Sequence, residues 1–289
     1  MAEPLWTPTP KQVESAKITK LRFLVNDEWG LSLGDSKALW EFSINEREKF
    51  WRTIIKFCDL KAETWGACDA IDVDQMPGAR WFPEARFNFA ENLLKRRDEG
   101  EAIVFWGENG ARRYMTFAEL YDAVSQLAEA LRSEGVGPGD RVAGFLPNVP
   151  EAIVSMLAAV SLGATWSSCS PDFGLQGVLD RFGQIRPKVL FTCDGYFYNG
   201  KAHDIRAKTG NLVREVSSIE RVIVIPYTET NPDLDVIPNA VQLADYVRDW
   251  PQMRWHSHRC HLTIRFIFSS PRGQPGALSV SSMRLAGCC

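Results

Sequence analysis

Residues 141–168 read RVAGFLPNVPEAIVSMLAAVSLGATWSS, and this stretch decides the class of fold. Its first six residues, 141–146, form an apolar run of strand length. Residues 150–162 predict a helix, because a proline suits the first helical turn, and Gly163 can end that helix in the left-handed conformation. Residues 165–168 then predict a second strand. A strand, a helix and a strand in this order indicate parallel strands joined by a crossover helix.

The same alternation continues on both sides of this stretch. Before it lie an apolar run at residues 102–106 and the capping box Thr116-Phe117-Ala118-Glu119, which predicts the start of a helix. After it, Ser170-Pro171-Asp172 predicts the start of another helix, with Asp172 as a capping residue. Residues 189–192 and 221–225 predict two buried strands. The alternation indicates a doubly wound α/β region.

The segment before this region is of a different kind. Residues 1–95 predict mostly helix, and apolar and aromatic side chains recur there at helical spacing, which predicts a packed face. The predicted fold class is therefore α/β, a partial doubly wound parallel sheet flanked by helices and preceded by a helical N-terminal segment. We expect three regions: a helical segment over residues 1–98, an incomplete α/β domain over 99–250, and an arginine-rich tail over 251–289.

Charge separates the tail from the rest of the chain. The whole chain carries a net charge of −3, but residues 251–289 contain five arginines and no lysine, aspartate or glutamate. Such a break predicts a disordered tail of different origin. The chain has no apolar run of about 18 residues, and its first residues lack an apolar signal core. We therefore expect no membrane span and a cytoplasmic protein, with its seven cysteines as free thiols.

Three motifs suggest other chemistry, and each has a simpler explanation. Gly135-Val136-Gly137-Pro138-Gly139 resembles a dinucleotide fingerprint, but it precedes a strand, whereas that fingerprint follows one. A helix stop and a turn explain it better. Four side chains of metal-ligand type lack the second pair that zinc sites have: His256, His258, Cys260 and His261. The tail arginines have no basic helix or aromatic platform beside them. We expect no metal site and no nucleic-acid partner.

An ordered series of motifs is more specific. The segments at residues 79–94, 145–152, 163–174 and 198–201 read ARWFPEARFNFAENLL, FLPNVPEA, GATWSSCSPDFG and YNGK. In this order they resemble the acyl-adenylate-forming (AMP-binding) enzymes, over roughly residues 3–250. The WSSCSPDFG segment is similar to that of the acetoacetate–CoA ligases within this family.

The resemblance implies a two-step reaction of acetoacetate or a similar short acyl acid. The carboxylate attacks the α-phosphate of ATP and releases pyrophosphate, and the thiol of CoA then displaces AMP. ATP, CoA and Mg²⁺ are implied as substrates and cofactor. The resemblance places the adenine contacts, the acyl pocket and a catalytic lysine beyond residue 289. We therefore expect no catalytic residue in this chain and an inactive enzyme.

The phosphate loop of the family departs from its pattern here. The family loop reads Ser-Ser-Gly-Thr-Thr-Gly-x-Pro-Lys, whereas residues 268–275 read FSSPRGQP. Pro271 removes a backbone donor, and the lysine is absent. Synonymous codons for residues 262–289 can be chosen so that another reading frame restores the family loop. We therefore interpret the tail as the product of a frame change near residues 248–261, which sequencing of the DNA would test.

The resemblance also implies a CoA site. Tyr198, Asn199, Gly200 and Lys201 are similar to a segment that contacts CoA phosphates, and Ser170 and Asp172 lie in a loop similar to one near the CoA channel. For Lys201 an exposed surface lysine explains the sequence equally well. A second hypothesis for the chain is a non-catalytic module that binds CoA or another protein. An incomplete sheet would also expose a strand edge through which copies associate.

Overall fold

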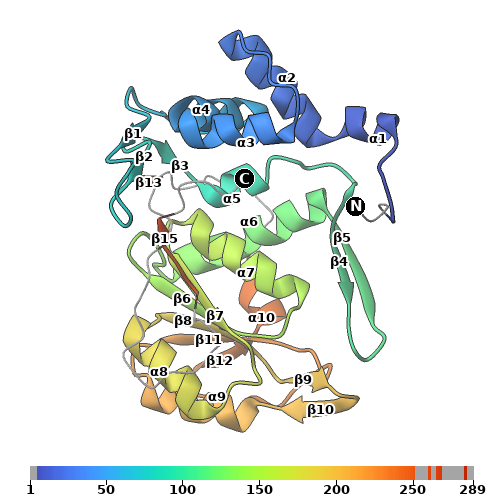
Figure 1. The fold of residues 1–289 in the computed structure, drawn as a ribbon. Coiled ribbons are helices and arrows are strands. Elements are labelled where there is room, and N and C mark those ends of the chain that lie inside the picture. Colours follow the sequence, from blue (N-terminus) through green and yellow to red (C-terminus); the bar gives the residue numbers. More distant parts are fainter. Residues whose placement is uncertain (1–4, 251–259, 262–264, 269–282, 285–289) are drawn as a thin grey trace. The chain divides into compact units, whose positions relative to one another are not determined.

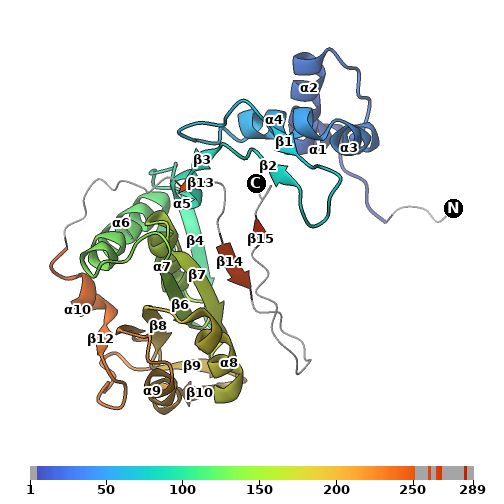
Figure 2. The same cartoon turned by 90° about the vertical axis from the view of Figure 1, so that its left-hand side faces the viewer.

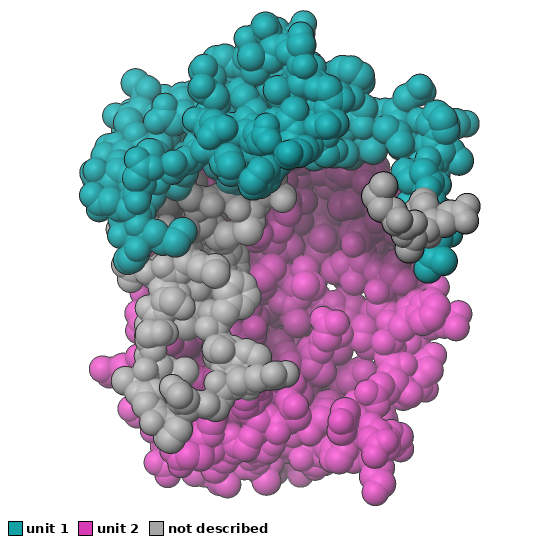
Figure 3. Space-filling model, viewed as in Figure 1, with its two compact units in different colours: residues 1–86, 286–289 teal, residues 87–285 magenta. Residues whose placement is uncertain are grey.

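The computed structural model describes residues 5–250, 260–261, 265–268 and 283–284. The chain divides into two compact units between residues 86 and 87 (Figure 3). Side chains are described for residues 5–250 only. His256, His258 and the segment 269–275 therefore lie outside the described residues, as do the side chains of Cys260 and His261. The predicted disorder of the tail stays a prediction.

The first unit is built mainly from four helices, α1 (Pro10–Ser15), α2 (Lys17–Trp29), α3 (Ser36–Asn45) and α4 (Arg47–Phe57). Their shared core contains Leu21, Val25, Leu39 and Phe42. The predicted packed face is only partly correct, because Trp40 is 58% exposed on the other side of α3. The rest of this unit is largely irregular and includes two short antiparallel strands, β1 (Ala70–Ile71) and β2 (Arg80–Trp81). The strand β3 (Arg86–Phe87) lies at the division.

A parallel sheet forms the centre of the second unit (Figure 1). Its five parallel strands run in the spatial order β12 (Ala240–Gln242), β11 (Arg221–Ile225), β8 (Val189–Cys193), β6 (Arg141–Phe145) and β7 (Thr165–Cys169). Beyond β7 lie β14 (Arg265–Phe268), also parallel, and β15 (Met283–Arg284), antiparallel. Ile267 and Phe268 of β14 pair with β7. The predicted association of copies through an exposed sheet edge stays a prediction.

Helices cover both faces of this sheet, as a doubly wound fold requires. In the view of Figure 1, α6 (Phe117–Ser133) and α7 (Pro150–Ser161) lie above the sheet, and α8 (Leu175–Ile185) and α9 (Arg206–Glu215) lie below it. Two short helices, α5 (Phe89–Leu93) and α10 (Leu243–Val247), complete the unit. The core between these layers is dominated by Phe145, Phe182 and Phe191, which are fully buried. The predicted α/β class is confirmed.

Short sequence motifs predicted several helix ends correctly and one incorrectly. Thr116 and Glu119 form the predicted capping box of α6. Gly163 follows α7 with a φ of +78°, the left-handed conformation expected of it. However, no helix begins at Ser170-Pro171-Asp172. The backbone amide of Phe173 instead donates to the Ser170 carbonyl in a turn, and α8 begins only at Leu175.

Two antiparallel hairpins stand apart from the central sheet. The first joins β4 (Glu101–Trp106) to β5 (Arg112–Thr116), so the apolar run at 102–106 is not a parallel strand. The second joins β9 (Gly195–Tyr198) to β10 (Lys201–Asp204). In Figures 1 and 2 the second hairpin lies on the same side of the sheet as α8 and α9. No helix among the described residues is long and apolar enough to cross a membrane.

Candidate functional site

The strand order predicts where this sheet binds a ligand. Counted along the chain from β6, the five strands lie in the order 2-1-3-4-5. The chain therefore moves from β6 to one side and then to the other, and the switch falls between β6 and β8. Ligands of open α/β sheets bind beyond the carboxyl ends of the strands at such a switch. The β9–β10 hairpin begins there, directly after β8.

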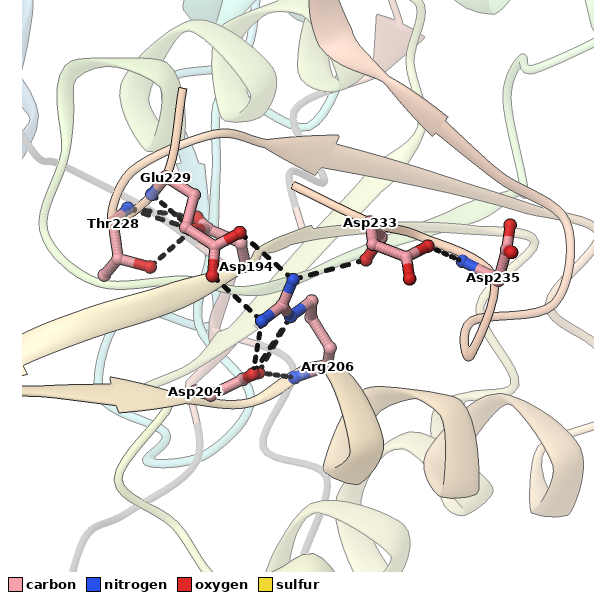
Figure 4. Close-up of polar contacts among 7 residues, drawn as sticks. All are labelled: Asp194, Asp204, Arg206, Thr228, Glu229, Asp233 and Asp235. Atoms are coloured by element: carbon pink, nitrogen blue, oxygen red, sulfur yellow. Dashed lines mark hydrogen bonds and ion pairs between the residues drawn. The ribbon is translucent and has the colours of Figure 1, made fainter. Parts of the chain in front are cut away.

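The root of this hairpin is held by a buried carboxylate (Figure 4). Asp194, between β8 and β9, is only 1% exposed. It accepts hydrogen bonds from the backbone amides of Tyr227, Thr228 and Glu229, at 2.6, 3.0 and 2.8 Å, and from the Thr228 hydroxyl. A buried carboxylate needs several donors to offset its lost hydration. Asp194 thereby fastens the hairpin to the loop that follows β11.

A second link holds the other end of the hairpin. Arg206, on α9, donates to both carboxylate oxygens of Asp204 and to both of Glu229 (Figure 4). It also reaches the backbone carbonyl of Asp233 at 3.5 Å. The hydrogen bond from Arg206 lowers the pKa of Asp204, and the bond to Asp204 raises the pKa of Arg206. Both strands of the hairpin are therefore fixed at their base to the loop that follows β11.

The predicted residues 198–201 form the tip of this hairpin. Asn199 and Gly200 have φ angles of +50° and +71°, the left-handed pair of a two-residue hairpin turn. An Asn-Gly pair is a known hairpin signal, and it could have revealed these strands from the sequence. Tyr198 is 62% exposed. Lys201 is exposed and has no ion-pair partner among the residues that the structure describes.

One face of the hairpin gathers aromatic and basic side chains. The cross-strand pairs Tyr196–His203 and Tyr198–Lys201 are two residues apart along each strand, so the four side chains share a face. The rings of Tyr196 and His203 stack with centroids 5.1 Å apart. The opposite face carries Phe197, whose ring packs edge-on against Tyr227 at 5.4 Å. The first face therefore combines the exposed ring of Tyr198 and the half-buried rings of Tyr196 and His203 with the ammonium group of Lys201.

The predicted residues Ser170 and Asp172 are exposed. Burial raises the pKa of Tyr196, and the negative charge of Asp172 raises it further, so the two side chains are close enough to interact. Asp172 does not cap α8, whose N-cap is Gly174 without a side-chain bond. The predicted capping role is thus wrong. The effect of Asp172 on Tyr196 links the two sequence segments that the resemblance assigned to CoA.

Three residues that support these segments had no sequence signal. The roles of Asp194 and Arg206 become clear only in the structure, where the loop after β11 lies against both side chains. Lys208 on α9 donates to the backbone carbonyls of Pro171 and Phe173 and so holds the turn. Among the described side chains, no three His, Cys, Asp or Glu residues are placed to hold a metal ion.

Comparison with known proteins gives the family. A model of the AMP-binding enzymes matches residues 89–250, and one of the acetyl-coenzyme A synthetase N-terminus matches residues 36–93. Acetoacetyl-coenzyme A synthetase of Rhizobium meliloti is 43% identical over 84% of this chain, and acetoacetyl-CoA synthetase of Danio rerio is 39% identical over the same share. A malonamoyl-CoA synthetase of Penicillium aethiopicum is 36% identical over 70% of the chain.

A solved structure agrees with this assignment. Acetoacetyl-CoA synthetase from Streptomyces lividans is 36% identical and superposes with a TM-score of 0.83, covering 91% of this chain and 40% of that one. The chain spans 37% of the length of the Rhizobium and Danio relatives. Both the sequence and the fold therefore lead to one assignment: the chain belongs to the AMP-binding enzyme family.

Proposed function

We propose that this chain carries the CoA-nucleotide site of an ATP-dependent acetoacetate–CoA ligase. The reaction of such a ligase converts acetoacetate, ATP and CoA to acetoacetyl-CoA, AMP and pyrophosphate. Relatives named acetoacetyl-CoA synthetase, at 36–43% identity, support this substrate over others. The malonamoyl-CoA relative is a second acid–CoA ligase, so the acyl acid is the less constrained part of the proposal.

The observation that carries the proposal is the tip of the β9–β10 hairpin. The nucleotide end of CoA presents phosphates and a purine ring. Lys201 offers an unpaired ammonium to a phosphate, and the exposed ring of Tyr198 offers a surface on which a purine can stack. Gly200 leaves the backbone open, because nothing lies within 4 Å of the position of a β-carbon there. Asn199 shapes the turn, and the charge of Asp172 acts on Tyr196 of the same face.

The described side chains offer CoA a free cation, Lys201, and an exposed ring, that of Tyr198. The segment that resembles the phosphate loop, 268–275, has no described side chains. We therefore derive no step through ATP or Mg²⁺ from this chain.

Titration calorimetry with CoA tests the proposed site. The chain should bind CoA, and Lys201→Met should weaken binding about tenfold, because it removes a charge-assisted bond to a phosphate. The matched control is Lys11→Met, which removes another exposed lysine, on α1. Absence of CoA binding by the unaltered chain, or unchanged binding after Lys201→Met, would contradict the proposal.

A non-catalytic CoA-binding or protein-interaction module is the second candidate function. It is favoured by residues 268–275, which lack the lysine of the family loop. Exchange of labelled pyrophosphate into ATP in the presence of acetoacetate separates the two. Exchange would establish adenylation and remove this candidate, whereas CoA binding without exchange would favour it.

A further inference from the structure

The first turn of α9 carries two cations that face different parts of the protein. Arg206 binds Asp204 and Glu229, as described above. Lys208 is two residues further along, and in a helix this spacing turns the side chains to nearly opposite sides. Its ammonium donates to the carbonyls of Pro171 and Phe173 at 3.0 and 3.1 Å. It also lies 5.7 Å from the centroid of the Phe145 ring.

The partners of Lys208 are unusual for a lysine. It is half-buried, and no carboxylate of the described residues pairs with it. Holding a long lysine side chain in one conformation costs rotamer entropy, so its fixed contacts must offset that cost. Both acceptors belong to a single turn, and they lie two residues apart. An ammonium group can reach both carbonyls only when the turn has one particular conformation.

Pro171 is buried and the Phe173 ring packs against the core, but few polar contacts from the described residues hold this turn. Ser170 and Asp172 are exposed, and Gly174 begins α8 without a side-chain cap. The Phe173 ring is covered by the guanidinium of Arg181, at 4.5 Å from its centroid. Within residues 170–173, the hydrogen bond from the Phe173 amide to the Ser170 carbonyl is long, at 3.3 Å. The two bonds from Lys208, at 3.0 and 3.1 Å, are shorter than this backbone bond and tie the turn to α9.

We propose that Lys208 is a positioning residue that sets the 170–173 turn at the distance from the β9–β10 hairpin at which both segments contact one CoA molecule. This inference rests on the proposed function. The hairpin ends at Asp204 and α9 begins at Arg206, so the hairpin and Lys208 belong to one continuous, fixed stretch of chain. The turn follows a different strand, β7. Lys208 is the link that joins them.

The test uses two ligands of different length. Adenosine 3′,5′-bisphosphate carries the nucleotide end of CoA without the pantetheine arm. In our proposal the hairpin binds the nucleotide end and the turn borders the arm. Lys208→Met keeps the length and apolar stem of the side chain and removes its donors. It should weaken CoA binding about tenfold, because a misplaced contact segment loses its interactions, and should change the binding of the bisphosphate less than about twofold.

Two further variants serve as controls. Lys208→Arg keeps the charge and the donors, and it should bind CoA within about threefold of the unaltered chain. Lys188→Met removes the same kind of bond elsewhere, from an ammonium to the carbonyl of Gly135 at 3.0 Å, and it should leave both ligands unaffected. Equal weakening of both ligands by Lys208→Met would indicate general damage and overturn the inference. So would unchanged binding of both.

Hydrogen exchange separates this inference from the proposed function. In the free chain, Lys208→Met should speed amide exchange at residues 173–175 and leave residues 195–204 unchanged. If the unaltered chain binds no CoA, the proposed function fails, while exchange still shows whether Lys208 holds the turn. If CoA binds but neither affinity nor exchange responds to Lys208→Met, the proposed function stands and the inference fails.

Discussion

The two hairpins of the second unit, β4–β5 and β9–β10, solve the same problem in different ways. A two-stranded hairpin is at best marginally stable alone in water, so each needs support from the body of the protein. Both pack on the ring of Tyr227. Its centroid lies 6.2 Å from that of the Phe105 ring on β4 and 5.4 Å from that of the Phe197 ring on β9. Beyond this shared contact, their anchors differ in burial and in number.

The β4–β5 hairpin is anchored at its surface. Arg113 forms a two-bonded ion pair with Glu151 at the start of α7, and the arginine side chain is 43% exposed. Its outer face exposes apolar groups, among them Trp106 at 67%. The β9–β10 hairpin is anchored by the buried Asp194 and by Arg206. The hairpin that carries the proposed CoA site is thus the one anchored by a buried carboxylate, as a rigid support for such a site requires.

The largest expected effect comes from the buried root. Asp194→Ala leaves three backbone amides and one hydroxyl without their acceptor, and we expect the free energy of unfolding to fall by about 3–4 kcal/mol. Urea denaturation followed by circular dichroism measures this change. Asp98→Ala is the matched control, because Asp98 accepts from the Gly100 amide and from Arg96 in an exposed turn. The control should unfold at the same urea concentration as the unaltered chain. An unchanged unfolding midpoint for Asp194→Ala would mean that the buried anchor stabilises the protein no more than the surface anchor of the β4–β5 hairpin does.

Arg206→Gln should have a smaller effect that depends on pH. Both carboxylate partners are about half exposed, so we expect a loss of about 1 kcal/mol at pH 7. The pKa of Asp204 is lowered in the folded protein from an ordinary value of 3.8. The stabilisation is therefore present above that value and is lost as the pH falls through the lower, folded pKa.

Thermal melts from pH 7 to pH 3 check this expectation. The difference in Tm between the unaltered chain and Arg206→Gln should shrink below about pH 4. The control is Arg214→Gln on the same helix, because Arg214 donates to the Asn211 side chain and the Val236 carbonyl and has no acidic partner in the described chain. A difference for Arg206→Gln that stays constant down to pH 3 would refute the role of Asp204.

The smallest expected effect concerns the surface anchor. Arg113→Gln should lower the free energy of unfolding by only about 0.5 kcal/mol, but it should speed amide exchange in β4 and β5 and leave β9 and β10 unchanged. Arg112→Gln is the control, because that guanidinium lies 4.5 Å from the centroid of the exposed Trp106 ring and pairs with no carboxylate of the described residues. Faster exchange in both hairpins after Arg113→Gln would show that they are coupled through Tyr227.

The sequence predicted the layers of the fold better than it predicted the support of the site. Periodicity and caps act over a few residues, so the capping box at Thr116 and the strands 189–192 and 221–225 were predictable. The segments of the proposed CoA site came from the resemblance, and the structure places them near each other. The hydrogen-bond partners of Asp194 lie at least 33 residues away in the sequence, and those of Lys208 at least 35 residues away. Apart from the Thr228 hydroxyl, their hydrogen-bond partners are backbone groups, which leave no residue-type pattern in the sequence.

Asp172 shows why a local signal can also mislead. A Ser-Pro-Asp sequence favours a helix start, but Lys208 draws the Pro171 and Phe173 carbonyls into a turn. Tertiary contacts thus override a capping preference worth about 1 kcal/mol. The opposite case is Asn199-Gly200, where the local preference and the structure agree.

The strand order also has a consequence for the chain as it is synthesised. One edge of β6 is paired with β7, which follows it closely, but the other edge waits for β8. About 24 residues separate the ends of β7 and β8. At translation rates of about 5–20 residues per second, β6 therefore presents a bare edge for about one to five seconds. During that interval the central strand of the future sheet is the part of the nascent protein most open to pairing with another chain.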